Sequence, residues 1–257
     1  MYLIVERFIR GSAPFSGGPP RSHLADNKKS TALNRLSRHV ILPTTALFIA
    51  AFAVLMLMKT VPYYSFKTGI HFLSTKSTVT NDNRWFRLAF YVHITSSLAV
   101  LTIGLLQWLP VVAKLGARLH RTLGRFYILG ILAFAAPSGF VLAHFANGGL
   151  VAQVAFSLQA VLWWFATLQA YRSARRRLWP QHVAWMLRSY AITLAALSLR
   201  GESYLFYYCL HTKPIETYLT VAWLSWVGNL LLVELLLQTG LLRFFLQTHL
   251  PQLKPHE

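Results

Sequence analysis

Long apolar segments alternate with short polar ones along most of this chain. Each apolar segment is roughly 20 residues long, which is the length that an α-helix needs to cross the hydrocarbon core of a membrane. The pattern predicts six such helices, at about 40–61, 88–112, 126–144, 150–171, 183–206 and 217–238. We therefore expect an all-α fold, a polytopic membrane helix bundle with about six transmembrane helices.

The segments outside the helices set the domain boundaries. Residues 1–39 are rich in Gly, Pro and basic side chains, so they are predicted to form a disordered basic N-terminal tail. The six-helix transmembrane domain covers 40–240, and a short C-terminal tail covers 241–257. Pro137 lies near the middle of the third helix, where a proline is expected to produce a kink.

Composition and charge support a membrane protein. Hydrophobic residues make up 55% of the chain and charged residues 12%, against about 25% charged residues in soluble domains. The net charge is +18, and Lys and Arg concentrate in both tails, in 114–125 and in 172–177. By the positive-inside rule both termini are cytosolic, and we expect a bacterial inner (cytoplasmic) membrane location. This charge suits anionic lipid rather than nucleic acid, because the aromatic residues lie in the apolar segments.

Four histidines lie near the ends of predicted helices. His120 and His182 fall at the cytosolic face, and His93 and His144 fall toward the outer face. Neutral imidazoles from neighbouring helices can ligate one haem iron between them, so these four are candidate cofactor-binding residues. His93, His120 and His182 are also the candidate metal ligands, and arginines beside the site would suit haem propionates. The two arginines at this position are Arg121 and Arg125.

Other interpretations of the histidines stay open. They can cap helix starts and bind lipid phosphate beside the basic loops, or they can bind another metal. Two-haem cytochromes usually carry their histidines deeper in the helices than His120 and His182 lie. The only cysteine, Cys209, excludes an internal disulfide, an iron–sulfur cluster and a cysteine zinc site.

Charged and polar side chains inside the predicted helices need partners. Arg188 in the fifth helix and Glu234 in the sixth are at similar depth, and pairing them would remove the cost of burying each. We expect a structural ion pair in preference to a proton or substrate path. Other polar groups inside the helices are predicted to form interhelical hydrogen bonds; they are Gln107, Gln153, Gln159, Ser189 and Asn229.

Six motifs, in order along the chain, resemble those of domain-of-unknown-function family 2306. They are His120-Arg121-x-x-Gly124-Arg125, Ala136-Pro137-Ser138-Gly139, Ala146-Asn147-Gly148-Gly149, His182-x-x-Trp185-Met186-x-Arg188-Ser189-Tyr190-Ala191, Leu199-Arg200 and Ala222-Trp223-Leu224-x-Trp226-x-x-Asn229-Leu230. The resemblance covers about 88–240 and implies a multipass membrane protein, mostly bacterial, with no established activity. His144 is not expected as part of the family pattern. The histidine arrangement is also similar, more weakly, to two-haem transmembrane cytochromes b.

These observations lead to one functional hypothesis and one alternative. The hypothesis is a b-type haem-binding transmembrane electron-transfer protein, an oxidoreductase or electron carrier whose catalytic residues are unknown. The alternative is a non-catalytic membrane subunit or a small-solute transporter with a structural Arg188–Glu234 core. Membrane lipids are the expected partners, with a protein partner or a homo-oligomer also allowed. Motifs of nucleotide-binding proteins, hydrolases and zinc proteases do not occur in the sequence.

Overall fold

The computed structural model describes residues 42–67, 69–108 and 116–239. The predicted N-terminal tail, the end of the second predicted helix and the C-terminal tail lie outside these residues. The described chain is built from helices joined by turns, without strands. The predicted all-α fold class is therefore confirmed.

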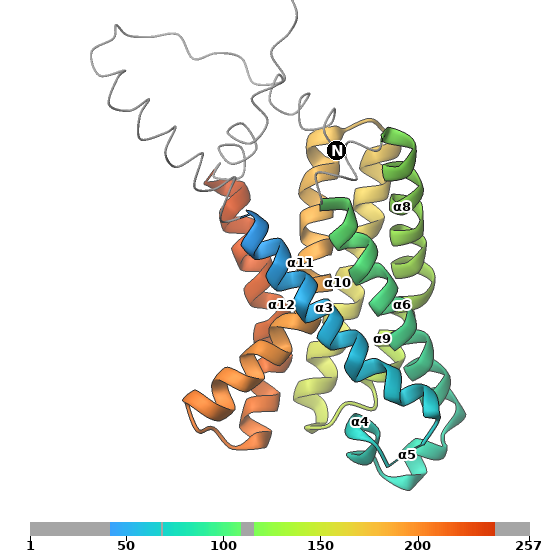
Figure 1. Ribbon diagram of the computed structural model, residues 1–257, viewed down its shortest axis with the longest axis vertical. Helices are drawn as coiled ribbons and strands as arrows, with labels where there is room; N and C mark the ends of the chain where they lie inside the picture. Colours follow the sequence, from blue (N-terminus) through green and yellow to red (C-terminus); the bar gives the residue numbers. More distant parts are fainter. Residues whose placement is uncertain (1–41, 68, 109–115, 240–257) are drawn as a thin grey trace, which may run out of the picture.

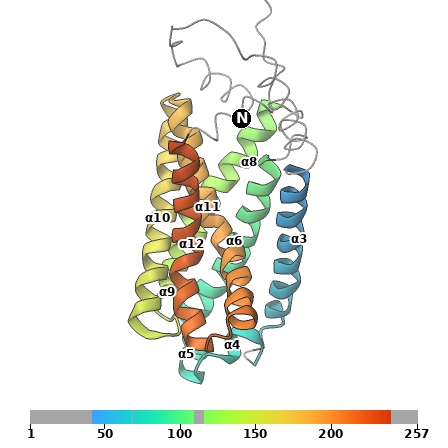
Figure 2. The same ribbon diagram turned by 90° about the vertical axis from the view of Figure 1, so that its left-hand side faces the viewer.

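Six long helical segments form an elongated bundle (Figures 1 and 2). They are α3 (Leu42–Thr60), α6 (Arg84–Trp108), α8 (Ala117–Leu129) continued by η3 (Gly130–Ala135) and α9 (Ala136–Ala143), α10 (Gly149–Arg175), α11 (Trp179–Tyr204) and α12 (Pro214–Gln238). Four short segments complete the described part: η2 (Val61–Ser65), α4 (His71–Ser74), α5 (Thr78–Asp82) and η4 (Leu205–Cys209).

Helix α11 occupies the middle of the bundle. It packs chiefly against α10 and α12, while α6 packs against the continuous helix formed by α8, η3 and α9. Small side chains let these helices approach closely, as Ala152 and Ala155 of α10 do against Ala222 of α12, all three fully buried. The polar residues Ser189 and Thr193 of α11 are buried among these helices.

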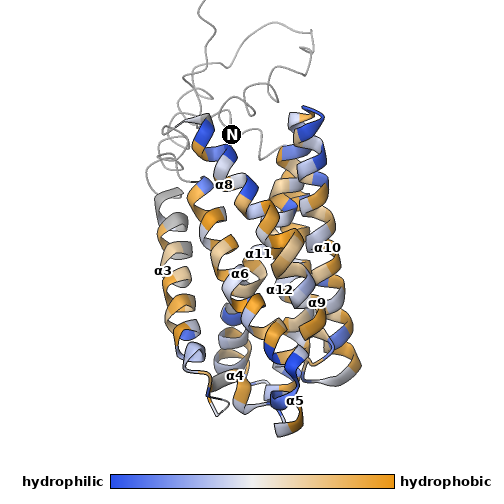
Figure 3. Cartoon of the chain, turned by 90° about the vertical axis from the view of Figure 1, so that its right-hand side faces the viewer, coloured by the Kyte–Doolittle hydropathy of each residue, from blue (hydrophilic) through white to orange (hydrophobic). Residues whose placement is uncertain are grey.

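Four of the described helical segments are long and apolar enough to cross a membrane. They are Arg84–Gln107, Arg118–Ala143, Gly149–Arg175 and Pro214–Gln238. Apolar residues dominate the middle of the bundle and polar residues gather toward its ends (Figure 3). The protein is therefore an integral, polytopic membrane protein, whereas the count of six spans and the cytosolic placement of both termini stay predictions.

The third helix begins earlier than the apolar pattern predicted. Helix α8 starts at Ala117 instead of near 126, so most of the predicted connection 114–125 is helical. Arg118, Arg121 and Arg125 lie on its exposed face, while His120 and Gly124 turn inward. A search for continuous apolar residues misses such an amphipathic turn, because every third or fourth residue is charged.

A π-turn, η3, lies directly before Pro137, where the sequence predicted a kink. Proline has no backbone N–H, so a carbonyl in the preceding turn loses its helical partner. The Trp164 indole Nε1 of α10 donates to the Leu132 carbonyl of η3 at 3.1 Å. Single π-turns inside α-helices are frequent near functional sites.

Lys76 joins the segment between α3 and α6 to the turn between α9 and α10. Its ammonium donates to the Phe145 carbonyl at 2.5 Å and to Asn147 Oδ1 at 2.7 Å. Burial lowers the pKa of Lys76 from 10.5 to about 8. These Lys76 hydrogen bonds lie at the opposite end of the bundle from the arginines of α8 and α10 (Figure 1). We call the arginine-rich end the basic end.

Candidate functional site

Helices α8 and α11 both begin at the basic end and run in the same direction (Figure 1). Their relative register is given by Tyr127, whose hydroxyl lies 3.2 Å from Ser189 Oγ and 2.9 Å from Thr193 Oγ1. His120 precedes Tyr127 by seven residues, and His182 precedes Ser189 by the same number. Seven residues are about two helical turns, so each histidine lies on the same face as its partner residue. The two histidines therefore lie at matching positions along α8 and α11.

The His120 and His182 imidazoles are close enough for their charges to interact. Both side chains are half-buried and lie in the first turns of their helices. The structure thus brings together the two histidines that the sequence placed at the cytosolic face. We call this region, formed by His120, Gly124, His182 and Gln107, the paired-histidine site.

One hydrogen bond fixes the orientation of the His182 ring. Nδ1 lies 2.8 Å from the Ala170 carbonyl oxygen of α10. A carbonyl oxygen only accepts hydrogen bonds, so Nδ1 carries the proton and Nε2 keeps a free lone pair. Trp179 packs edge-on against the same ring, with 6.4 Å between the ring centroids. A backbone carbonyl behind one ring nitrogen is the usual support of a histidine that ligates a metal through the other.

The His120 imidazole has no hydrogen-bond partner among the described residues. Arg121 follows it on an exposed face of α8, close enough for its charge to act on the His120 ring. Arg125 lies one turn further along that face and is also exposed. Both candidate propionate partners are therefore beside the site and are not engaged in salt bridges among the described residues.

Gly124 leaves room directly below His120, because residues four apart share one helix face. A Cβ atom at Gly124 would have one non-local neighbour within 4 Å, the Gln107 amide nitrogen at 3.8 Å. Gln107 comes from the last turn of α6 and is only 8% exposed. Its Nε2 atom is buried and has no hydrogen-bond partner in the described structure. An unpaired buried donor thus lies against the Gly124 position of α8, one turn from His120.

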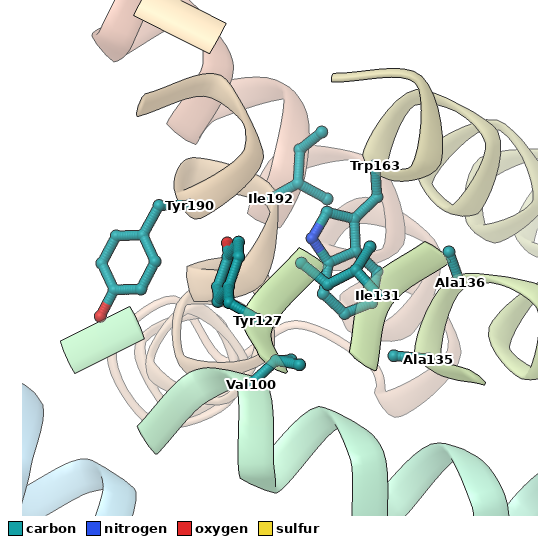
Figure 4. Close-up of a cluster of buried hydrophobic side chains, with 8 residues drawn as sticks. All are labelled: Val100, Tyr127, Ile131, Ala135, Ala136, Trp163, Tyr190 and Ile192. Atoms are coloured by element: carbon teal, nitrogen blue, oxygen red, sulfur yellow. The ribbon is translucent and has the colours of Figure 1, made fainter. Parts of the chain in front are cut away.

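A buried hydrogen-bond network closes the site toward the middle of the bundle. Thr193 Oγ1 accepts from the Trp163 indole at 3.1 Å, and Thr167 and Ser189 share a hydrogen bond of 2.7 Å. Tyr127, which is fully buried, joins both ends of this network. Tyr127 and Trp163 also belong to the buried cluster drawn in Figure 4. The network links α8, α10 and α11 through buried side chains.

His93 lies in a separate environment, against the π-turn of the third helix. Its Nδ1 is 2.9 Å from the Ala135 carbonyl oxygen, and its Nε2 is 3.4 Å from Ser97 Oγ. The ring lies on Gly139, where a Cβ atom would come within 2.9 Å of the His93 ring. The glycine in the Ala-Pro-Ser-Gly motif is therefore needed to seat this histidine.

The structure does not bring His144 to His93. His144 is exposed at the end of α9, where its Nδ1 pairs with the Phe140 carbonyl at 2.9 Å. Its ring packs edge-on against Phe140, with 5.1 Å between centroids. Within the described residues, no group of three or more His, Cys, Asp or Glu side chains could hold a metal ion.

Arg188 and Glu234 form a two-point ion pair between α11 and α12. Arg188 Nε and Nη2 donate to the two carboxylate oxygens at 2.5 and 2.9 Å. The Trp185 ring covers the guanidinium at 4.6 Å. Exposed fractions of 23% for the arginine side chain and 36% for the glutamate make the pair half-buried, so each charge is satisfied without complete burial.

The predicted interhelical hydrogen bonds form at three of the positions discussed above. Ser189 bonds to Tyr127 and Thr167, Asn229 bonds to Ser198 and to the Ala191 carbonyl, and Gln153 donates to the His144 carbonyl. Gln107 and Gln159 are the exceptions. Neither side chain has a hydrogen bond among the described residues, and the buried amide nitrogen of Gln107 lies nearest to Gly124.

Comparison with known proteins places the chain in a family. A family model described as "Predicted membrane protein (DUF2306)" matches residues 90–237, which include both histidines of the site and the ion pair. Searches of curated proteins and of solved structures found no significant match. The matched segment covers more than half of the chain, so the protein belongs to the DUF2306 family of predicted membrane proteins.

Proposed function

We propose that this integral membrane protein binds one b-type haem at the paired-histidine site and carries electrons there. The observation that carries the proposal is the register of α8 and α11, which sets His120 and His182 in matching turns at the basic end. Two imidazoles from neighbouring helices are the usual axial ligands of such a haem, and when bound the group supplies one-electron redox chemistry.

The residues of the site fit this group in three respects. The Ala170 carbonyl holds His182 in the tautomer that leaves Nε2 free to bind iron. Gly124 leaves a helix face open where any larger side chain would narrow it. Arg121 and Arg125 supply positive charge beside the site, which suits the propionate carboxylates. The protein's own part is to bind the iron and orient one ligand.

The proposal includes one haem, in contrast to the two haems of a two-haem cytochrome. His93 is held by Ala135 and Ser97, and His144 is exposed on another face, so a second pair of ligands has no structural support. With the basic end on the cytosolic side, the proposed haem would lie near the cytosolic face of a bacterial inner membrane. A protein partner would then deliver or accept the electron.

The alternative is a non-catalytic membrane subunit or a small-solute transporter built around Arg188 and Glu234. The two charges satisfy each other through two hydrogen bonds, which supports a structural role in joining α11 to α12. A colourless protein from haem-replete cells would favour this alternative.

An absorption spectrum of the purified full-length protein tests the proposal. Protein expressed with ample haem precursor should show a Soret band, and His120→Ala and His182→Ala should each strongly reduce it. His211→Ala is the matched control, because His211 is exposed in the turn before α12 and should leave the band unchanged. A colourless wild type, or equal loss in all three variants, would contradict the proposal.

A further inference from the structure

The buried amide of Gln107 is an unusual feature of this bundle. Its residue is 8% exposed, and its Nε2 has no partner in the described structure. Leaving a buried donor unpaired costs about 1–3 kcal/mol, and the large majority of buried polar side chains have a partner. The other interhelical amides with recorded bonds, Gln153 and Asn229, donate to backbone carbonyls. Gln107 therefore needs a physical explanation that packing of the described helices does not supply.

The position of this amide suggests the explanation. Nε2 lies nearest to the Gly124 position on α8, one turn below His120 on the same face. One turn earlier on α6, the Tyr190 ring covers Gly104. The unpaired donor thus lies at the contact between α6 and α8, one turn from His120.

We propose that Gln107 is a positioning residue of the paired-histidine site, whose amide donates a hydrogen bond to a carboxylate oxygen of the ligand held by His120 and His182. This inference rests on the proposed haem function, in which the carboxylate is a propionate. An amide N–H group needs an acceptor, and a hydrogen bond to a charged acceptor is stronger than one between neutral groups. Arg121 and Arg125 favour the same negatively charged acceptor from the exposed side of α8.

Melting temperatures of the haem-free protein distinguish a role of Gln107 in ligand binding from a role in packing. If Gln107 serves the ligand, replacing it with leucine removes an unpaired donor from the haem-free protein and adds apolar contact. The haem-free Gln107→Leu variant should therefore melt at the wild-type temperature or higher. The matched control is Gln153→Leu, which loses a hydrogen bond to the His144 carbonyl and should melt at a lower temperature.

Haemin titration of the full-length protein in detergent, followed by the Soret band, provides the second measurement. Gln107→Leu should weaken haemin binding about tenfold, while Gln153→Leu should bind haemin as the wild type does. Gln107→Asn, whose shorter amide cannot reach as far, should fall between leucine and wild type.

The outcomes distinguish the role of Gln107 from the haem function itself. Haemin affinity unchanged in Gln107→Leu would overturn the role of Gln107 and leave the histidine site standing. A marked fall in the melting temperature of haem-free Gln107→Leu would also overturn it, because the residue would then act in packing. A wild type that binds no haemin, or binds it equally after His182→Ala, would remove the haem function and this inference together.

Discussion

The Arg188–Glu234 pair offers a quantitative test of how α11 and α12 are joined. Glu234→Gln keeps the side-chain size but removes the negative charge, so Arg188 is left as a half-buried cation without a counterion. Exposed ion pairs contribute about 0.2–1 kcal/mol, and removing one partner of a buried pair costs about 3–5 kcal/mol. The exposed fractions of 23% and 36% lie between these cases. We therefore expect the free energy of unfolding to fall by about 2–3 kcal/mol.

Thermal unfolding in detergent measures this loss. For a protein of this size, 1 kcal/mol corresponds to about 2–4 °C, so the melting temperature should fall by roughly 5–10 °C. Glu216→Gln is the control, because Glu216 is exposed at the start of α12 and an amide oxygen can still accept from the Lys213 N–H. The double variant with Arg188→Gln should lose less than the sum of the single variants, since the pair is already broken. An unchanged melting temperature in Glu234→Gln, or strictly additive losses, would refute the pairing.

Three further predictions concern the six-span topology, the hydrogen bonds of Lys76 and the buried hydrogen bonds of Tyr127. Reporter fusions after Gly149 and at the C-terminus should report opposite sides of the membrane, and the same side for both would contradict the six-span topology. Lys76→Met should lower stability by breaking the bonds to Phe145 and Asn147. Because burial lowers the pKa of Lys76 to about 8, the unfolded chain binds more protons between that value and 10.5. The wild-type melting temperature should therefore rise with pH across this range relative to Lys76→Met, and a relative fall would exclude the assigned pKa. Tyr127→Phe should cost about 1–3 kcal/mol in the free energy of unfolding, because Ser189 and Thr193 lose a buried partner; an unchanged melting temperature would argue against the network.

The sequence predicted the membrane class and the partner of Arg188 because both depend on local and one-dimensional signals. Apolar length identifies helices that cross a membrane, and a charge inside such a helix requires an opposite charge at similar depth. The limits of the helices were less accurate, because α8 begins in an amphipathic turn around His120 where arginines interrupt the apolar run.

Contacts between helices depend on rotation about each axis, and hydropathy does not determine that rotation. The sequence placed His93 and His144 toward the same outer face from depth alone, whereas the structure turns His144 outward and seats His93 on Gly139. The role of Gly124 was also hidden, although its spacing of four from His120 and three from Tyr127 marks one inward-facing stripe. The unpaired amide of Gln107 could not be found without side-chain positions.

The spin state of the ferric protein tests the central claim most directly. Electron paramagnetic resonance distinguishes a low-spin iron with two imidazole ligands from a high-spin iron with one. The account predicts a low-spin signal in the wild type and conversion to a high-spin signal, with loss of haem, in both His120→Ala and His182→Ala. A wild type without haem, or a low-spin signal that persists in His120→Ala, would contradict the paired-histidine site.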